Sequence, residues 1–237
     1  MSASDLSVGD ALVAAGYPVI VDPDVHEPRA GLWLPLAEVR RPERVLELVE
    51  RYTAWLRVPH RAAGGACAGQ HYAGRVAGYL VGTWALTGGI ASLEDPRLLA
   101  EVDQHGRTLR LIVPRDPRTA PGGAPELVRG LQNHLAPLLD VVRVAVGVTP
   151  RLAWGGVATS VAGAFGRAVQ TVPMSRRAEV VSGAHAALDP ARWPGERPLV
   201  TLAADATSHG RHTCCLIFLS ADHEECRTCP RRVRLQP

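Results

Sequence analysis

The sequence predicts an α+β protein that is mostly helical. It should consist of a helical body, a central β-hairpin and a small C-terminal strand and loop segment that binds metal. Three observations support this prediction: long stretches carry apolar residues at helical spacing, one short stretch alternates as a strand does, and four of the five cysteines lie beyond residue 213. A chain of 237 residues can bury enough surface to fold without disulfide bonds.

The first part of the chain is expected to form three helices. Residues 5–15 carry apolar side chains at helical spacing and are followed by Gly16, which suits a helix C-terminus. A second helix should begin at Pro42, a residue favoured in the first helical turn, and reach about Arg57. A third is expected from about residue 62 to 86, where alanine and glycine dominate. Glycines recur there along one helix face, at Gly74, Gly78 and Gly82, which predicts close approach to a neighbouring backbone.

A β-hairpin is predicted near the middle of the chain. Residues 98–103 and 108–113 flank the turn sequence Gln-His-Gly-Arg at 104–107. Apolar and polar residues alternate through the start of the second stretch, as they do in a strand with one buried face.

Three further helices are expected after this hairpin. The first should cover residues 125–146 and be kinked or divided at Pro137, because proline removes a backbone donor. The second should start at Pro150, with Thr149 as its N-cap, and reach about Gln170. The last is expected over residues 174–188.

The C-terminal part is predicted to be a separate small unit. A proline-rich linker at 192–198 precedes an apolar stretch at 199–202, which we expect to pair with a strand at 214–219. This division gives a mostly helical body at residues 1–198 and a metal-binding segment at 199–237.

The cysteines of this segment form the strongest functional signal in the chain. Cys214 and Cys215 are adjacent, and Cys226 and Cys229 follow ten residues later as a C-x-x-C pair. Four soft thiolates select zinc, copper(I) or an iron–sulfur cluster. Adjacent cysteines in extended backbone point to opposite faces, so both can serve one centre only if the chain bends there or the centre is larger than one ion. A two-iron cluster is such a centre. Cys67 lies outside this spacing and is expected to be a small buried residue.

The motif resembles a known family. Arg211-x-x-Cys-Cys-Leu-x-Phe, a polar gap and Cys-x-x-Cys-Pro230 are similar to the C-terminal signature of the FhuF-like ferric-siderophore reductases, bacterial proteins that hold a [2Fe–2S] cluster in this motif. The resemblance implies that the cluster ligands, and the redox-active residues of catalysis, are Cys214, Cys215, Cys226 and Cys229. It also implies that the body at 1–198 binds the siderophore. A weaker likeness to the family's helical body covers the sequences at 70–72 and 152–158.

Other polar residues near the motif have alternative explanations. The histidines at 209, 212 and 223 are close enough to be ligands, but four thiolates already complete a set, so we expect surface histidines. A helical His or Trp is usually a core or groove residue; the family likeness adds the hypothesis that His71 and Trp154 line the substrate cleft.

Several arginines lie within the motif or directly after it. Arg211 and Arg227 lie inside it and are predicted to be close to the cluster, where positive charge stabilises the more negative reduced form. The arginines at 231, 232 and 234 are expected either to do the same or to form a solvated tail.

The resemblance implies one-electron reduction of a ferric siderophore, with release of Fe(II) in the cytoplasm. The expected substrate is a hydroxamate rather than a catecholate chelate, and the expected electron donor is a ferredoxin or a flavoprotein. Two alternatives stay open: a structural zinc site on a helical binding protein, and an iron–sulfur sensor or iron-delivery protein without reductase turnover.

Composition and motifs exclude several other classes. A formal net charge of +3 does not predict binding to nucleic acid. No signal peptide or membrane span is expected, which favours a cytoplasmic protein in which clustered thiols bind metal rather than form disulfides. The sequence contains no P-loop, dinucleotide-binding or hydrolase motif.

Overall fold

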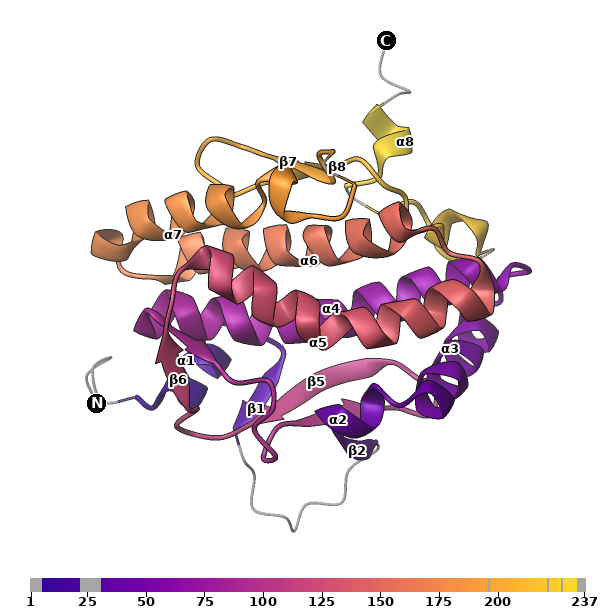
Figure 1. Cartoon of the computed structure of the whole chain (residues 1–237), viewed down its shortest axis with the longest axis horizontal. Coiled ribbons are helices and arrows are strands. Elements are labelled where there is room, and N and C mark those ends of the chain that lie inside the picture. The colour runs from indigo at the N-terminus through magenta and orange to yellow at the C-terminus, as the bar shows by residue number, and fades with distance from the viewer. Residues whose placement is uncertain (1–5, 22–30, 196, 221, 227, 234–237) are drawn as a thin grey trace.

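The computed structural model describes residues 6–21, 31–195, 197–220, 222–226 and 228–233. For residues 232 and 233 it describes the backbone alone. Its centre consists of three long helices, α4 (Arg61–Thr87), α5 (Ala124–Val146) and α6 (Pro150–Thr171). A sheet lies on one side of them and the C-terminal segment on the other (Figure 1). Within the described residues, no helix is long and apolar enough to span a bilayer.

Close packing explains the small residues of α4 and α6. These two helices are the most extensively packed pair in the protein, and alanine and glycine make up much of the buried surface of both. A Cβ atom on Gly64 of α4 would lie 1.8 Å from Oγ1 of Thr53, a residue of α3 (Pro42–Leu56). A Cβ atom on Gly82 would lie 2.5 Å from Leu12. Gly64 therefore permits close approach to the backbone of α3, whereas the nearest atoms to Gly74, Gly78 and Gly82 belong to side chains.

The predicted hairpin is confirmed, and its two strands are the central pair of a four-stranded sheet. Strands β4 (Leu99–Val102) and β5 (Thr108–Val113) pair antiparallel. Two edge strands that the sequence analysis did not identify complete a sheet of order β1-β5-β4-β2: β1 (Val19–Val21), parallel to β5, and β2 (Leu32–Pro35), antiparallel to β4. The short helix α2 (Leu36–Val39) follows β2 directly.

The predicted helices are present with small differences at their ends. They are α1 (Val8–Ala14), α3, α4, α5, α6 and α7 (Met174–Ala187), and Thr149 caps α6 as expected. Of the two alternatives predicted at Pro137, a kink or a division, the division is wrong, because α5 is one continuous helix. Leu135, Leu138 and Leu139 are at most 4% exposed on either side of the proline, and this burial holds both halves on the core.

Short elements connect these helices. Strands β3 (Gly89–Ala91) and β6 (Thr119–Pro121) pair antiparallel between α4 and α5. A single 3-10 turn, η2 (Pro190–Arg192), follows α7 and leads to the C-terminal segment.

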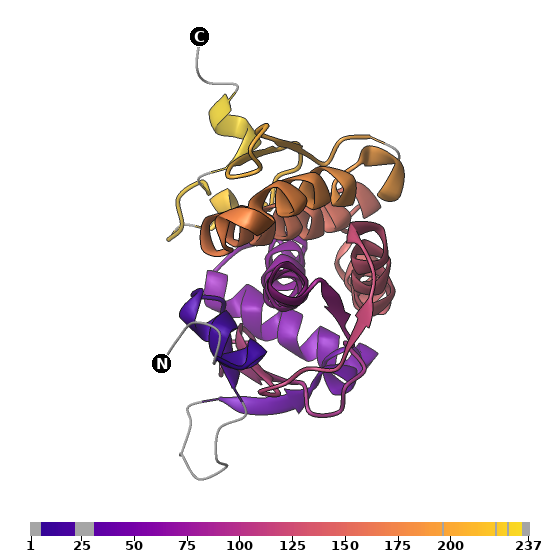
Figure 2. The same ribbon diagram turned by 90° about the vertical axis from the view of Figure 1, so that its left-hand side faces the viewer.

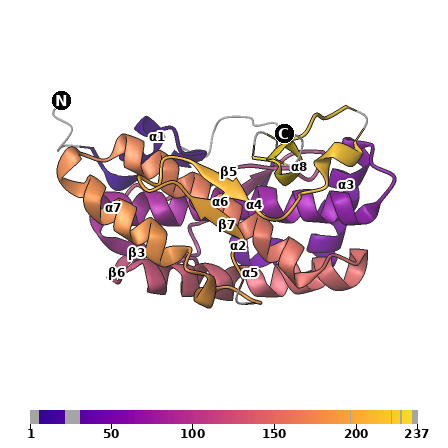
Figure 3. The same ribbon diagram turned by 90° about the horizontal axis from the view of Figure 1, so that it is seen from above.

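The C-terminal strand pairing differs from the prediction. Strand β7 (Val200–Leu202) pairs with β8 (His209–Arg211), which ends before the cysteines. The predicted strand at 214–219 is wrong: Leu216 adopts a left-handed conformation with φ 65°, and the 3-10 turn η3 (Ile217–Leu219) follows. The left-handed residue turns the chain, so pairing cannot continue. The β7–β8 hairpin lies across α6, and the short α8 (Pro230–Val233) lies beyond it (Figures 2 and 3).

Candidate metal centre

Two contacts fix the chain on either side of the adjacent cysteines. Before them, Thr213 packs directly on α6 at Gly155, where a Cβ atom would lie 2.0 Å from the threonine Oγ1. After them, the Ser220 hydroxyl donates to the backbone oxygen of Leu56 at the end of α3. Between these anchors the turn at Leu216 directs the chain back, so that the cysteines lie between α4, α6 and the end of α3.

The four motif cysteines gather as two pairs of free thiols. The Sγ atoms of Cys215 and Cys226 are 4.0 Å apart, and none of the described cysteines forms a disulfide. The thiols of Cys214 and Cys229 interact as the second pair. The backbone N–H of Cys229 donates to the oxygen of Cys226 at 2.9 Å, which is the turn expected of a C-x-x-C sequence.

The environment of these thiols suits a bound cation. The neighbouring Cys215 thiol and burial hold the pKa of Cys226 well above its usual range, and burial raises the pKa of Cys214, with Cys215 and Cys229 adding to the shift. Thiols that raise one another's pKa in this way keep their protons until a metal replaces them. In the described part of the chain, no group of three or more His, Cys, Asp or Glu side chains surrounds a single-ion position. The pairwise arrangement of four soft donors fits a two-iron cluster.

Arg211 contributes a buried positive charge to this site. Its side chain is 4% exposed, and its Nη1 atom lies 3.9 Å from Sγ of Cys226. Its Nε atom donates to the backbone oxygen of Thr213, while Nη2 is buried without a hydrogen-bond partner among the described residues. A buried guanidinium is costly unless a negative group lies close to it. A cluster held by thiolates would supply that negative charge.

Of the other predicted arginines, the structure describes the side chain of Arg231. Arg227 and Arg234 are outside the described residues, and the side chain of Arg232 is also not described. Arg231 lies over the ring of Phe218, 3.9 Å from its centroid, and pairs with Glu225 at 3.2 Å. These two contacts attach α8 to the cysteine loop, the segment between Thr213 and α8 that carries the four cysteines.

Two of the three nearby histidines have partners other than the cysteines. His212 Nε2 is 2.8 Å from the Thr201 hydroxyl, and His223 Nδ1 is 3.0 Å from that of Ser220. His209 lines a groove that ends at Cys229. The ligand set of four thiolates stays a prediction.

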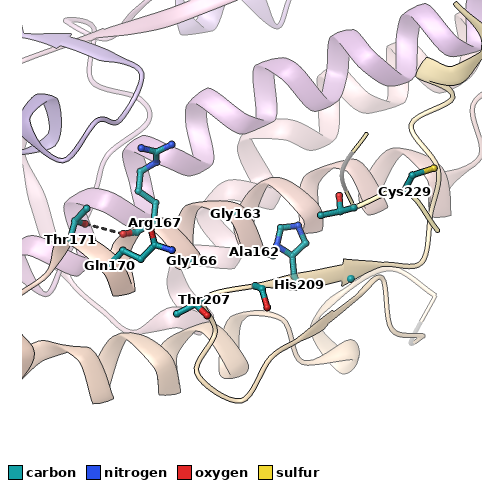
Figure 4. Close-up of a pocket in the computed structure, with 12 residues that line it drawn as sticks. Ala162, Gly163, Gly166, Arg167, Gln170, Thr171, Thr207, His209 and Cys229 are labelled. Carbon is teal, nitrogen blue, oxygen red and sulfur yellow. Dashed lines mark hydrogen bonds between the residues drawn. The ribbon is translucent and has the colours of Figure 1, made fainter. Parts of the chain in front are cut away.

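Two cavities reach the cysteines from different directions. The Cys229 groove, of about 650 Å³, runs between α6 and the β7–β8 hairpin, from Arg167 and Gln170 past His209 to Cys229 (Figure 4). The Cys226 cavity, of about 360 Å³, opens on the side of α4. Its polar and sulfur-bearing lining consists of Tyr52, Cys67, Gln70, His71, Arg75, Ser160, Cys215 and Cys226. Both volumes are in the range of small-molecule sites.

Sequence reasoning found some of this lining and missed the rest. His71 lines the Cys226 cavity, whereas Trp154 packs edge-to-face against Trp193. Cys67 is buried as expected, yet it lies beside the motif, with Sγ donating to the backbone oxygen of Cys215 at 3.2 Å. Tyr52 and Arg75 were not identified, because neither belongs to a motif and only folding brings them to the cysteines.

The fold and the site together define a mostly helical α+β protein whose C-terminal segment can bind a cluster. Comparison with protein families is consistent with this class: the FhuF 2Fe-2S C-terminal domain matches residues 211–231, which contain all four cysteines. The match is consistent with an FhuF-like family and supports a [2Fe–2S] cluster as the cofactor. No curated protein matches the chain.

Proposed function

We propose that this protein is a ferric-siderophore reductase that releases Fe(II) in the cytoplasm. The observation that carries the proposal is the match to an FhuF 2Fe-2S domain over the segment in which four free thiols gather in two pairs. In this proposal Cys214, Cys215, Cys226 and Cys229 hold a [2Fe–2S] cluster. When bound, such a cluster supplies one electron at a time.

Each part of the chain has a role in this proposal. Residues 1–198 form the body that binds the chelate, and residues 199–237 form the cluster-binding segment. Arg211 stabilises the reduced state by placing positive charge beside Cys226, and Arg227 is proposed to do the same from within the motif. A ferredoxin or a flavoprotein would return the electron after each turnover.

The chemistry of the substrate explains why a single electron is sufficient. Hydroxamate and catecholate oxygens are hard ligands that suit Fe(III) better than Fe(II). Reduction of the bound Fe(III) to Fe(II) therefore weakens the chelate and frees the metal while the organic ligand stays intact. We propose hydroxamates as the preferred class, because catecholates hold Fe(III) more strongly and leave it harder to reduce.

The test is stoichiometric electron transfer. The protein is purified without oxygen, its iron, sulfide and zinc are quantified per chain, and the reduced form is mixed with a ferric trihydroxamate. We expect two iron and two sulfide per chain. We also expect one Fe(II) formed per protein reoxidised, measured with an Fe(II)-specific chromophoric chelator. Zinc without sulfide would establish a structural site, and a reduced cluster that passes no electron to any ferric chelate would identify a sensor or delivery protein.

The ligand set has its own test. Serine replaces each of the five cysteines in turn, and visible absorption is measured after identical anaerobic purification. We expect the chromophore to be lost or strongly altered in the four motif variants and retained in Cys67→Ser, which keeps a donor to the Cys215 carbonyl at this buried position. Loss of colour in Cys67→Ser together with retention in Cys226→Ser would contradict the assignment.

A further inference from the structure

The Cys226 cavity has polar groups whose orientation is fixed by a chain of hydrogen bonds. Arg75 Nη2 lies 2.7 Å from His71 Nε2, and His71 Nδ1 lies 3.2 Å from the hydroxyl of Tyr52. A guanidinium can only donate, so His71 Nε2 must accept and the ring must be neutral with its proton on Nδ1. Burial, together with Arg75 and Arg107, lowers the pKa of His71 to about 4, in agreement with a neutral ring.

This orientation makes Tyr52 a hydrogen-bond donor toward the cavity. Because His71 donates its Nδ1 proton to the Tyr52 oxygen, the tyrosine hydrogen is left for an acceptor elsewhere. Tyr52 lines the same cavity as Cys215 and Cys226. A ligand that presents an oxygen atom beside these cysteines would receive that hydrogen bond.

Two more groups in the cavity are incompletely paired among the described residues: Arg75 lacks an acidic partner and Oε1 of Gln70 lacks a hydrogen-bond partner. A ligand could provide both. Arg75 is half-buried and donates Nε to the backbone oxygen of Thr108, but no described carboxylate lies within ion-pair distance of it. Gln70 Oε1 is buried without a hydrogen-bond partner in the described structure. An uncompensated cation and an unpaired polar atom are costly in a folded protein, and both are common where a polar ligand binds.

The Cys229 groove is less suited to an oxygen-rich chelate. Its arginine, Arg167, already donates Nη1 to the backbone oxygen of Gly16 at 3.0 Å and lies over the ring of Tyr17. The only motif cysteine in its lining is Cys229, which is 2% exposed. The Cys226 cavity, by contrast, is lined by two motif cysteines and by Arg75. Neither arginine has an acidic partner among the described residues, but Arg75 is half-buried whereas Arg167 is exposed.

We propose that the Cys226 cavity is the binding site for the ferric chelate, with Arg75 and Tyr52 donating hydrogen bonds to the chelate's oxygen atoms. This inference rests on the proposed reductase function and specifies where its substrate lies. The chelate would contact the cluster through the side formed by Cys215 and Cys226. His71 is then a positioning residue, because it orients Tyr52 and holds Arg75.

The test separates binding from electron transfer. Gallium(III) has the size and charge of Fe(III) but is not reduced, so a gallium trihydroxamate reports binding alone. Its affinity for the oxidised, cluster-loaded protein is measured by titration calorimetry for wild type, Arg75→Gln, Arg75→Lys, Tyr52→Phe and His71→Gln. Arg167→Gln serves as the matched control, because Arg167 is also an arginine that lines a cavity beside the cysteines.

The expected losses follow from the strength of the hydrogen bonds. Arg75→Gln should weaken binding about tenfold or more, Tyr52→Phe about two- to tenfold, and Arg167→Gln not at all. Arg75→Lys keeps the charge but not the contact to His71, so it should recover only part of the loss. A gallium trihydroxamate that carries an added carboxylate should lose more affinity in Arg75→Gln than the neutral form does.

The binding site and the reductase function can be refuted separately. Weaker binding in Arg167→Gln with wild-type binding in both Arg75→Gln and Tyr52→Phe would place the chelate in the Cys229 groove and overturn this inference, even if the wild type reduces ferric chelates. Tight gallium binding that depends on Arg75, in a wild type that reduces no ferric chelate, would support the site and refute the reductase. If Arg75→Gln does not fold, Tyr52→Phe decides the result, because it removes one hydroxyl and keeps the packed ring.

Discussion

Arg211 is a buried cation that lies beside the cysteines. Its Nη1 atom is 3.9 Å from Cys226, and its side chain is almost completely shielded from water. Charge at this depth acts strongly on the two redox states of a cluster, because little solvent screens it. Arg231 lies in the same segment but pairs with Glu225 and is about half-exposed.

Replacing Arg211 with Gln should lower the midpoint potential of the cluster. The substitution removes positive charge that favours the more negative reduced state. We expect a fall on the order of tens of millivolts, where about 59 mV corresponds to a tenfold change in a one-electron equilibrium. Redox titration followed by visible absorption measures the shift. Arg231→Gln is the control and should change the potential less; an equal shift in both variants would show that Arg211 has no special position.

His134 contributes to the dependence of stability on pH. It is 2% exposed and shares a 2.8 Å hydrogen bond with Tyr72, and burial, with Arg40 adding to the effect, lowers its pKa to about 3. Glu94 lies 3.9 Å from Nδ1 and would favour protonation, but its side chain is 67% exposed and well solvated, so burial prevails. His134 is therefore neutral in the folded protein and becomes protonated, with a pKa near 6.5, only on unfolding.

The free energy of unfolding should consequently fall as the pH drops from about 6.5 toward 3. In this window the unfolded chain binds more protons than the folded one, so stability rises with pH. The contribution of His134 has a limiting slope of about 1.4 kcal/mol per pH unit. Urea unfolding of wild type and His134→Leu at pH 7.0, 6.0 and 5.0 tests this. A difference between the two proteins that does not change with pH would contradict a neutral His134.

Helix α6 positions the cysteine loop through one close contact. Gly155 allows Thr213 to lie against the helix backbone, two residues before Cys215. The same helix carries Gly163, where the nearest atom to an added Cβ would be His209 Cε1 at 4.0 Å. Gly155 is buried and Gly163 is exposed, and of the two only Gly155 touches the segment that leads to the cysteines, so an alanine at Gly155 should displace that segment and one at Gly163 should not.

Gly155→Ala should destabilise the protein and reduce its iron content. Overpacking of this kind costs about 1–3 kcal/mol, and the strain falls on the segment that carries the ligands. Gly163→Ala should be neutral or stabilising by up to about 1 kcal/mol, since alanine is the better helix former. Iron per chain and thermal unfolding are measured for both variants. Full iron occupancy in Gly155→Ala would show that Thr213 does not hold the cysteines in place.

At the level of elements, local patterns predicted most of the helices and the hairpin, and failed where distant parts of the chain decide the structure. Helical periodicity located α3 and α4 within one or two residues at each end. Strand β1 is only three residues long and exists through its pairing with β5, so it carries little pattern of its own. The apolar run after Cys215 resembles a strand, but Leu216 turns it into η3, which packs on α4.

The whole molecule brings the cysteine loop to residues that lie far away in the chain. A small core group beside the motif joins Cys215 to Tyr52, Leu56 and Cys67, from α3 and α4. The hydrogen bond between Cys67 and Cys215 spans 148 residues. The C-x-x-C spacing predicts ligands from local chemistry alone, whereas Cys67, Tyr52 and Arg75 have no local signal that relates them to a metal. For this reason a candidate ligand set can be predicted from the sequence, whereas the surrounding cavity cannot.

Beyond that core group, the polar attachments of the loop are weak. Arg57 and Asp222 form an ion pair 2.5 Å long, but the arginine side chain is 72% exposed, and exposed pairs contribute about 1 kcal/mol at most. The Ser220 hydroxyl adds one hydrogen bond to Leu56. The body, in contrast, has a continuous core that includes α4, α5 and α6. Much of the stability of the segment should therefore come from the metal that its cysteines bind.

Removing the cluster should loosen residues from about 204 onward while the body stays folded. Arg211 provides a specific readout, because trypsin cuts after arginine only where the chain can open, and this side chain is 4% exposed in the folded protein. Apo protein prepared with an iron chelator and a reductant should be cut after Arg211 much faster than cluster-loaded protein. Cuts within α4, α5 and α6 should stay slow in both, as followed by mass spectrometry. Equal cleavage of the segment and the body in the apo form would mean that the cluster stabilises the whole protein, and unchanged cleavage after Arg211 would mean that packing on α3 and α6 is sufficient to hold the segment.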